Sequence, residues 1–116
     1  MDLNVTRHLS GELSRSDWRL MILHYLGVDH IGHLEGPGSS RMGSKMREMD
    51  IVVRQLYDGL VASWTEQDAE KRGLPPLLVV LGDHGMGDMG SHGGASKGEV
   101  ETPLVFLSPA FANKTT

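Results

Sequence analysis

The sequence contains no cysteine, few aromatic residues and no long apolar run. The absence of cysteine excludes disulfides, but it does not place the protein in the cytosol, because secretory proteins need not contain them. No apolar run approaches the roughly eighteen residues that a membrane-spanning helix needs. The first residues, MDLNVTRHLSGELSRSDW, also lack the apolar centre of a signal peptide. Any targeting information of a secretory protein would therefore lie outside this chain.

The chain also lacks a run of basic residues, and its formal net charge is −4. This charge argues against nucleic acid as a partner. The chain has 116 residues, of which 39% are hydrophobic and 5% aromatic, and this length suits one modest domain. Its 15 glycines and 5 prolines lie mostly around the histidines, which places several histidines in loops.

Three short apolar runs bounded by turn residues predict strands, at residues 18–27, 77–81 and 102–108. Between the first two, apolar residues three and four positions apart predict an amphipathic helix from Arg41 to about Ala69. The apolar stripe, which we interpret as core, comprises Met42, Met46, Met49, Val53, Leu56, Leu60 and Trp64. A strand, a long helix and a second strand predict a parallel pair joined by a right-handed crossover. The expected fold class is therefore α/β.

Polar residues that can bind metal follow the apolar run 77–81. Asp83 and His84 come directly after Gly82, and His92 lies in the glycine-rich stretch that follows. Open α/β sheets bind their ligands at the carboxyl ends of their strands, which is where these side chains are expected. Oxygen and nitrogen ligands of this kind suit Zn²⁺, Mn²⁺ or Fe²⁺. The alternative is an ordinary polar loop after a strand.

A similar arrangement follows the first predicted strand, where Gly27 precedes Asp29, His30 and His33. A spacing of four residues places Asp29 and His33 on one face of a helix. The nearby glycines favour a turn or a short helical hook instead, and either form can direct both side chains at one ion. We expect His30 to point elsewhere, beside the metal ligands or toward the substrate. We expect His24, inside the apolar run, to be a hydrogen-bonded residue and not a ligand.

Five residues are thus candidate metal ligands: Asp29, His33, Asp83, His84 and His92. The loops that carry them are expected to emerge at the same edge of a parallel sheet. Five ligands are too many for one tetrahedral ion and too few for two closed sites, so open coordination positions remain. Open positions are typical of hydrolytic and transfer centres. Two ions roughly 3.5–4 Å apart would stabilise the attacking and leaving oxygens of a phosphoryl transfer.

Four stretches carry a resemblance to a known family: LHYLGVDHIGHLEGPGSSRM, MREMD, LLVVLGDHGMGDMGSHGGAS and EVETPLVFLSP. They resemble the lumenal domain of the glycosylphosphatidylinositol (GPI) ethanolamine phosphate transferases, which belong to the alkaline phosphatase superfamily. The resemblance extends from about Asn4 to Phe111. It implies an enzyme on the lumenal side of the endoplasmic reticulum membrane. Its expected reaction moves phosphoethanolamine from phosphatidylethanolamine to a mannose of the GPI anchor precursor.

The resemblance also implies how the candidate ligands divide between two metal ions. Asp29, His33 and His92 would hold one ion, and Asp83 and His84 would hold the other. The ions would be Zn²⁺, with Mn²⁺ as the alternative. The resemblance leaves open whether a partner subunit is needed. We expect attachment to the membrane through segments outside this chain.

Members of the superfamily carry a further Asp, and a Thr or Ser nucleophile, N-terminal to these motifs. This chain contains neither in that context, and Thr6 does not match the nucleophile motif. We therefore expect residues 1–116 to be a partial alkaline-phosphatase-like catalytic domain, with the catalytic nucleophile and the membrane-spanning region outside the chain. Catalysis by the chain alone is not expected.

Two alternatives to the transferase follow from the same residues. One is a metal-dependent phosphodiesterase or phosphatase of the same superfamily, because the metal ligands are shared between transfer and hydrolysis. The other is an inactive metal-binding remnant. The triplets that begin at Asn4 and Asn113 fit the N-glycosylation pattern and matter only in a secretory location. Residues 1–17 show no clear periodicity and are expected to be irregular.

Overall fold

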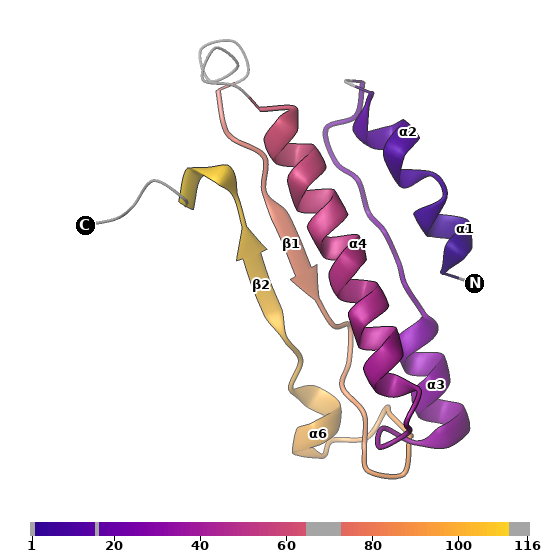
Figure 1. Ribbon diagram of the computed structural model, residues 1–116. Helices are drawn as coiled ribbons and strands as arrows, with labels where there is room; N and C mark the ends of the chain where they lie inside the picture. Colours follow the sequence, from indigo (N-terminus) through magenta and orange to yellow (C-terminus); the bar gives the residue numbers. More distant parts are fainter. Residues whose placement is uncertain (1, 16, 65–72, 112–116) are drawn as a thin grey trace.

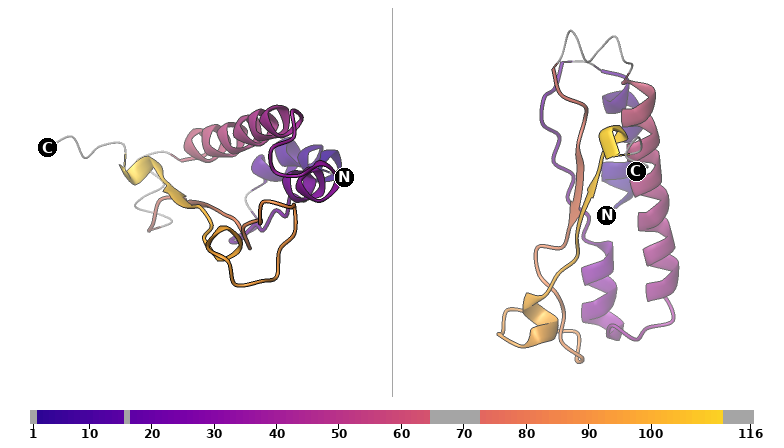
Figure 2. Two further views of the ribbon diagram at one scale, coloured as in Figure 1. Left: turned by 90° about the horizontal axis from the view of Figure 1, so that it is seen from below. Right: turned by 90° about the vertical axis from the view of Figure 1, so that its left-hand side faces the viewer.

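The computed structural model describes residues 2–15, 17–64 and 73–111, and it combines helices with a small sheet (Figure 1). The elements are α1 (Leu3–Thr6), α2 (Leu9–Leu13), α3 (Gly27–Glu35), α4 (Met42–Ala62), β1 (Leu78–Leu81), α6 (Lys97–Val100), β2 (Leu104–Leu107) and a 3₁₀ turn (Pro109–Phe111). In the right-hand view of Figure 2 the extended segments form one layer, and α1, α2 and α4 form the other. The mixture of helix and strand agrees with the expected class at this coarse level.

The two strands run antiparallel, with Leu78 opposite Leu107 and Leu81 opposite Leu104. The predicted strands at 77–81 and 102–108 are therefore confirmed, and they pair with each other. The expected parallel pair of residues 18–27 with 77–81 does not form among the described residues. The partner of β1 is the strand that follows it, not the apolar run that precedes it. The backbone from Gly82 onward returns along β1, and the Gly82 amide donates to the carbonyl of Pro103 at 3.2 Å.

The apolar run at residues 18–27 is extended but forms no strand in the described structure. Leu20 and Ile22 are 77% and 82% exposed, whereas Leu23 packs against the core. No backbone hydrogen bond among the described residues joins this segment to β1. It nevertheless runs beside α4 in the same direction as β1 (Figure 1). Residues 18–27 and β1 are thus not joined by backbone hydrogen bonds among the described residues, although both segments lead to the same end of the molecule (Figure 1).

The core lies where α2 and the extended segment meet α4. Leu9, Val52 and Leu56 are its buried members, and Leu23, Tyr25, Met49 and Leu78 pack around them with Leu13. Leu9 is only 1% exposed, so the expectation that residues 1–17 are irregular is wrong. Helices of four and five residues are too short to produce the periodicity that reveals longer helices.

Helix α4 confirms the predicted amphipathic helix, from Met42 to Ala62; its expected extension to Ala69 lies outside the described residues. The core face is turned slightly from the predicted stripe. Val52 is buried in place of Val53, and Met46 is 54% exposed, so Met46 is not core. None of the described helices has the length and apolar character needed to cross a membrane.

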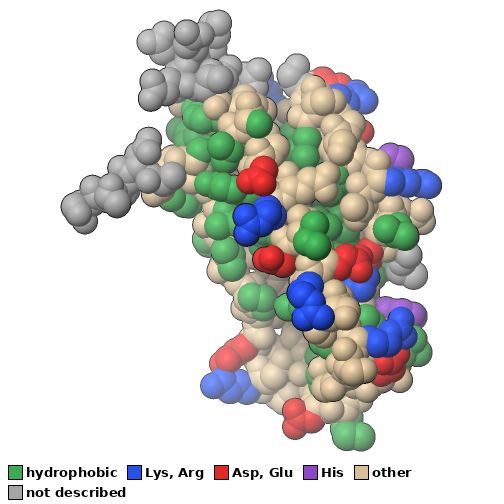
Figure 3. All heavy atoms as spheres, viewed as in Figure 1, with side chains coloured by type: hydrophobic (Ala, Val, Ile, Leu, Met, Phe, Trp, Pro, Cys, Tyr) green, Lys and Arg blue, Asp and Glu red, His purple; other side chains and the backbone are tan. Residues whose placement is uncertain are grey.

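One face of the sheet remains uncovered by the described residues. On that face Val79 and Leu81 of β1 are 38% and 62% exposed, and Leu104 and Phe106, opposite them on β2, are 59% and 51% exposed. Hydrophobic side chains gather accordingly at the left of Figure 3, where β1 and β2 lie. The Asn4 triplet lies in α1 with an exposed side chain, and the Asn113 triplet lies outside the described residues.

Candidate metal centre

Helix α3 supplies the first two candidate ligands. Asp29 lies in its first turn and His33 one turn later, so both side chains share one face. The Nε2 atom of His33 lies 3.3 Å from Oδ1 of Asp29. Of the two forms considered from the sequence, a regular helix is the one that forms. The glycines of α3 do not interrupt the helix. Gly32 instead permits a close contact with the loop that carries His92.

That loop follows β1 and folds back onto α3. Gly90 is buried, adopts a φ of 75°, and lies so close to the Gly32 carbonyl that an added Cβ would be 2.2 Å from its oxygen. The turn is closed by hydrogen bonds from the Gly87 amide to Ser91 and from the Gly90 amide to Gly87. Only glycine permits both this backbone conformation and this contact. The result places Nε2 of His92 at 3.5 Å from Oδ1 of Asp29.

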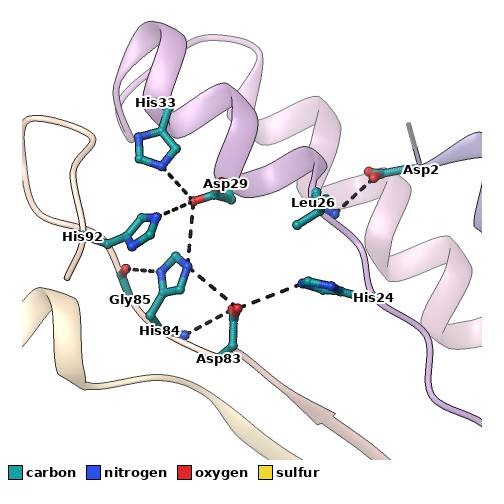
Figure 4. Close-up of polar contacts among 9 residues, drawn as sticks. All are labelled: Asp2, His24, Leu26, Asp29, His33, Asp83, His84, Gly85 and His92. Carbon is teal, nitrogen blue, oxygen red and sulfur yellow. Dashed lines mark hydrogen bonds and ion pairs between the residues drawn. The ribbon is translucent and has the colours of Figure 1, made fainter.

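Three imidazoles therefore surround one carboxylate oxygen (Figure 4). His84 is the third, with Nε2 at 4.0 Å from Oδ1 of Asp29. The rings of His84 and His92 stack with centroids 3.6 Å apart, and the rings of His33 and His92 lie 4.9 Å apart at an angle. Within the described residues, potential ligand atoms of Asp29, His33 and His92 all lie within 4.8 Å of one another.

The central oxygen of this cluster is buried and accepts no hydrogen bond from the described residues. A buried carboxylate oxygen without a partner costs roughly 1–3 kcal/mol, or more when it is charged. A tetrahedral zinc site with bonds of about 2.1 Å separates its ligand atoms by about 3.4 Å. The distances from Oδ1 of Asp29 to Nε2 of His33 and Nε2 of His92, 3.3 and 3.5 Å, match this separation. The residues present thus fit a divalent cation.

Asp83 and His84 form a neighbouring, more open group. The Nδ1 atom of His84 lies 2.8 Å from the carbonyl oxygen of Gly85, which can only accept, so Nδ1 carries a proton. In the neutral ring this leaves a lone pair on Nε2, which lies 3.8 Å from Oδ2 of Asp83. His84 therefore lies between the carboxylates of Asp29 and Asp83. The structure brings all five candidate ligands together in one group of contacts (Figure 4).

Two other histidines behave differently from these ligands. His30 is exposed and is not part of the group of possible ligand atoms formed by Asp29, His33 and His92 among the described residues. His24 reaches the second group instead: its Nε2 lies 4.0 Å from Oδ2 of Asp83, and its side chain is 67% exposed. Nothing in the spacing of the sequence links His24 to Asp83, because the contact depends on the path of the extended segment beside β1.

Glu99 is a further residue of the site that the sequence interpretation missed. Its carboxylate accepts hydrogen bonds from the Gly94 amide at 3.0 Å and from the Ser96 amide and hydroxyl. These bonds, chiefly that of the Ser96 hydroxyl and then that of the Gly94 amide, lower the pKa of Glu99 below its ordinary value. The spacing of Ser96 and Glu99 is that of a capping box, a signal that could have revealed this contact.

Comparison with known families identifies one whose sequence model spans the residues of the site. A sequence model of the type I phosphodiesterase / nucleotide pyrophosphatase family matches residues 2–100, which include all five candidate ligands. The chain belongs to this family. The cluster around Asp29 therefore lies in the part of the chain that matches the family.

Several individual proteins are similar to the chain over nearly its whole length. The chain is 50% identical to the human protein named GPI ethanolamine phosphate transferase 2, catalytic subunit, over 114 residues. It is 49% identical to the Aspergillus fumigatus GPI ethanolamine phosphate transferase 2 over 116 residues, and 46% identical to that of Saccharomyces cerevisiae over 114. These alignments cover 98%, 100% and 97% of the chain, but only 11%, 14% and 13% of the relatives. No solved structure matches the chain.

Proposed function

We propose that residues 1–116 are part of the catalytic domain of an enzyme that transfers phosphoethanolamine from phosphatidylethanolamine to a mannose of the GPI precursor. The observation that carries the proposal is the convergence of three imidazoles on the buried Oδ1 atom of Asp29. Such a cluster suits metal-assisted chemistry at phosphorus. The choice of substrates rests on the relatives, all of which are named GPI ethanolamine phosphate transferase 2.

In this proposal Asp29, His33 and His92 hold one metal ion, and Asp83 and His84 contribute to a second. Zn²⁺ is the proposed ion, and Mn²⁺ is the alternative for the same donors. Ions of this kind stabilise charge on phosphoryl oxygens and favour deprotonation of a nucleophile. The described residues orient the ligands: α3 holds Asp29 and His33 in register, Gly90 holds the His92 loop against α3, and the Gly85 carbonyl fixes the His84 ring.

The cellular setting follows from the same relationship. We propose that the enzyme acts at the endoplasmic reticulum membrane, with this part on the lumenal side, where Asn4 would be available for glycosylation. The name of the human relative describes that protein as a catalytic subunit, which supports a partner subunit for this enzyme too. Attachment to the membrane would come through other segments of the same polypeptide.

Hydrolysis is a second candidate function, and the description of the family, which names phosphodiesterases and pyrophosphatases, favours it. The same ligands would serve if water replaced the mannose as the acceptor. Incubation of the purified gene product with phosphatidylethanolamine, with and without a mannose-containing GPI precursor, separates the two. Phosphoethanolamine on mannose supports transfer, whereas free phosphoethanolamine in equal amount under both conditions supports hydrolysis.

The test of the proposed function is complementation in yeast. The gene that encodes this chain is expressed in Saccharomyces cerevisiae cells lacking their relative, and the GPI precursors are analysed by mass spectrometry. We expect phosphoethanolamine to return to the precursors, and we expect His92→Ala to abolish it. His8→Ala, a change at an exposed histidine on α1's C-terminal side, is the control and should restore it fully. Unmodified precursors at normal protein abundance would overturn the proposal.

A further inference from the structure

Asp2 is a buried carboxylate that links three segments of the chain. It is 4% exposed, and its backbone carbonyl accepts hydrogen bonds from the amides of Val5 and Thr6 in α1. Its side chain reaches across to the start of α3, where Oδ1 accepts hydrogen bonds from the amides of Leu26 and Gly27 at 3.2 and 3.1 Å (Figure 4). Its other oxygen, Oδ2, lies 3.3 Å from Nζ of Lys45 in α4.

These contacts supply what α3 lacks locally. The first amides of a helix have no partner within the helix, and a side chain at the N-cap normally satisfies them. The N-cap of α3 is Leu26, whose side chain has no acceptor. Asp2, from a distant part of the chain, accepts hydrogen bonds from the amides of Leu26 and Gly27, the N-cap and the first residue of α3. Its negative charge is also favourable beside the positive end of the helix dipole.

Gly27 permits this approach because it has no side chain. A Cβ at this position would lie 2.1 Å from Oδ2 of Asp2 and 3.0 Å from Cε of Lys45. The backbone conformation of Gly27 does not itself require glycine, since its φ is not positive. The contact with Asp2 therefore accounts for glycine at this place.

We propose that Asp2 is a positioning residue for the candidate metal centre. By fixing the first turn of α3, it fixes the direction in which Asp29, two residues beyond Gly27, and His33, one turn later, present their side chains. Lys45 completes the arrangement: it is 17% exposed, and its Nζ also lies 2.8 Å from Glu48, so the charge of Asp2 is paired within the protein. The positioning of the metal ligands rests on the proposed function, whereas the cap on α3 does not.

Hydrogen exchange of the backbone amides tests the cap directly in the 116-residue chain. Asp2→Ala should raise the exchange rates of the Leu26 and Gly27 amides by at least about tenfold, because they lose their acceptor. Asp2→Asn keeps a carbonyl acceptor at Oδ1 and should preserve most of the protection. Asp17→Ala removes an exposed carboxylate that pairs with Arg15 and is the matched control. Unchanged exchange at both amides in Asp2→Ala would overturn the proposal.

A double-mutant cycle keeps the proposal testable even if Asp2→Ala weakens folding. Gly27→Ala alone should be destabilising, because its methyl group collides with Asp2. In the Asp2→Ala background that methyl group has space, so the added cost of Gly27→Ala should largely disappear. When two residues are in contact, the effects of their substitutions on the free energy of unfolding do not add. Additive costs would show that Asp2 and Gly27 are not coupled and would contradict the proposal.

Metal affinity distinguishes positioning of the ligands from a purely structural cap. Zn²⁺ titration under conditions where all variants are folded should show a loss of about tenfold or more for Asp2→Ala, since residues that orient ligands typically contribute 10- to 100-fold. Asp2→Asn should recover most of this loss. Wild-type affinity in folded Asp2→Ala would overturn the positioning role. If wild type itself binds no Zn²⁺, the proposed function fails, and the exchange rates still decide whether Asp2 caps α3.

Discussion

The carboxylates of Asp29 and Asp83 lie on either side of His84, at 4.0 and 3.8 Å from its Nε2. Asp29 projects from a capped helix and has a buried oxygen, while its side chain is 32% exposed. Asp83 follows the end of β1, and its side chain is 71% exposed. The two groups therefore contain the same residue types, but the side chains around Asp29 are more firmly held in place than those around Asp83. We infer that the Asp29 group binds a metal ion with the described residues alone, whereas the Asp83 group binds one weakly.

The difference has a structural origin. The ligands around Asp29 come from α3 and from a loop that packs tightly on α3, so their relative positions are fixed by backbone contacts. His24, which faces Asp83, lies in an extended segment that makes no backbone hydrogen bond to β1 among the described residues. His84 follows Asp83 directly in the chain. A site with fixed ligands loses less conformational entropy when it binds an ion.

The largest expected effect is at the two carboxylates themselves. Asp29→Ala should reduce Zn²⁺ affinity by more than about 100-fold, because it removes a ligand and not merely a residue that orients one. Asp83→Ala, the matched change at the exposed carboxylate, should reduce it by less than about tenfold. Calorimetric titration of both variants measures the difference. Equal losses would show that the two groups do not differ in the way proposed.

A smaller effect is expected from the loop that delivers His92 to Asp29. Gly90→Ala should lower the free energy of unfolding by roughly 1–3 kcal/mol more than Gly36→Ala. Both residues have positive φ values, 75° and 81°, but only Gly90 has backbone atoms in the place of a Cβ. The pair thus separates the close contact with α3 from backbone strain. Urea denaturation measures it, and similar losses in the two variants would mean that the contact is unimportant.

The smallest effect concerns pH and the carboxylate that holds the His92 loop. The pKa of Glu99 is lowered from 4.5, first by the Ser96 hydroxyl and then by the Gly94 amide. Its contribution to stability is therefore complete above the unfolded value near 4.5 and is lost as the pH falls through the lower folded value. The stability advantage of wild type over Glu99→Gln should be constant near pH 6 and shrink in more acidic solution. The control is Glu101→Gln, at an exposed carboxylate 3.8 Å from Lys97. A constant advantage at every pH would contradict this reading of Glu99.

The sequence predicted the parts of the fold that have a long or clear pattern. Helix α4 was predicted because its apolar periodicity extends over many residues, and both strands because short apolar runs lie between turn residues. The antiparallel pairing of β1 with β2 was not predicted, because the expected parallel crossover required residues 18–27, before α4, to form a strand. That segment has one face on the core and one in solvent, yet its amides at Leu26 and Gly27 bond to Asp2 and not to a sheet.

The candidate site shows the same division between local pattern and tertiary contact. Asp29 and His33 could be grouped by their spacing, and Asp83 with His84 by their place after a strand. The contact of His24 with Asp83 and the cap that Asp2 provides depend on segments that meet only in the folded chain. The roles of the five candidate ligands in metal binding remain predictions, which the titrations described here test.

The most direct test of the account is a calorimetric titration of Zn²⁺ into the purified chain, compared with His33→Ala and His84→Ala. Three ligands and an open position are typical of a zinc centre, so wild type should bind about one ion. His33→Ala should abolish most of the binding, because Nε2 of His33 lies 3.3 Å from Oδ1 of Asp29. His84→Ala should change it little, because His84 lies 4.0 Å away, between the two carboxylates. Two equally tight ions in wild type, or equal losses in the two variants, would contradict the assignment of the site to Asp29, His33 and His92.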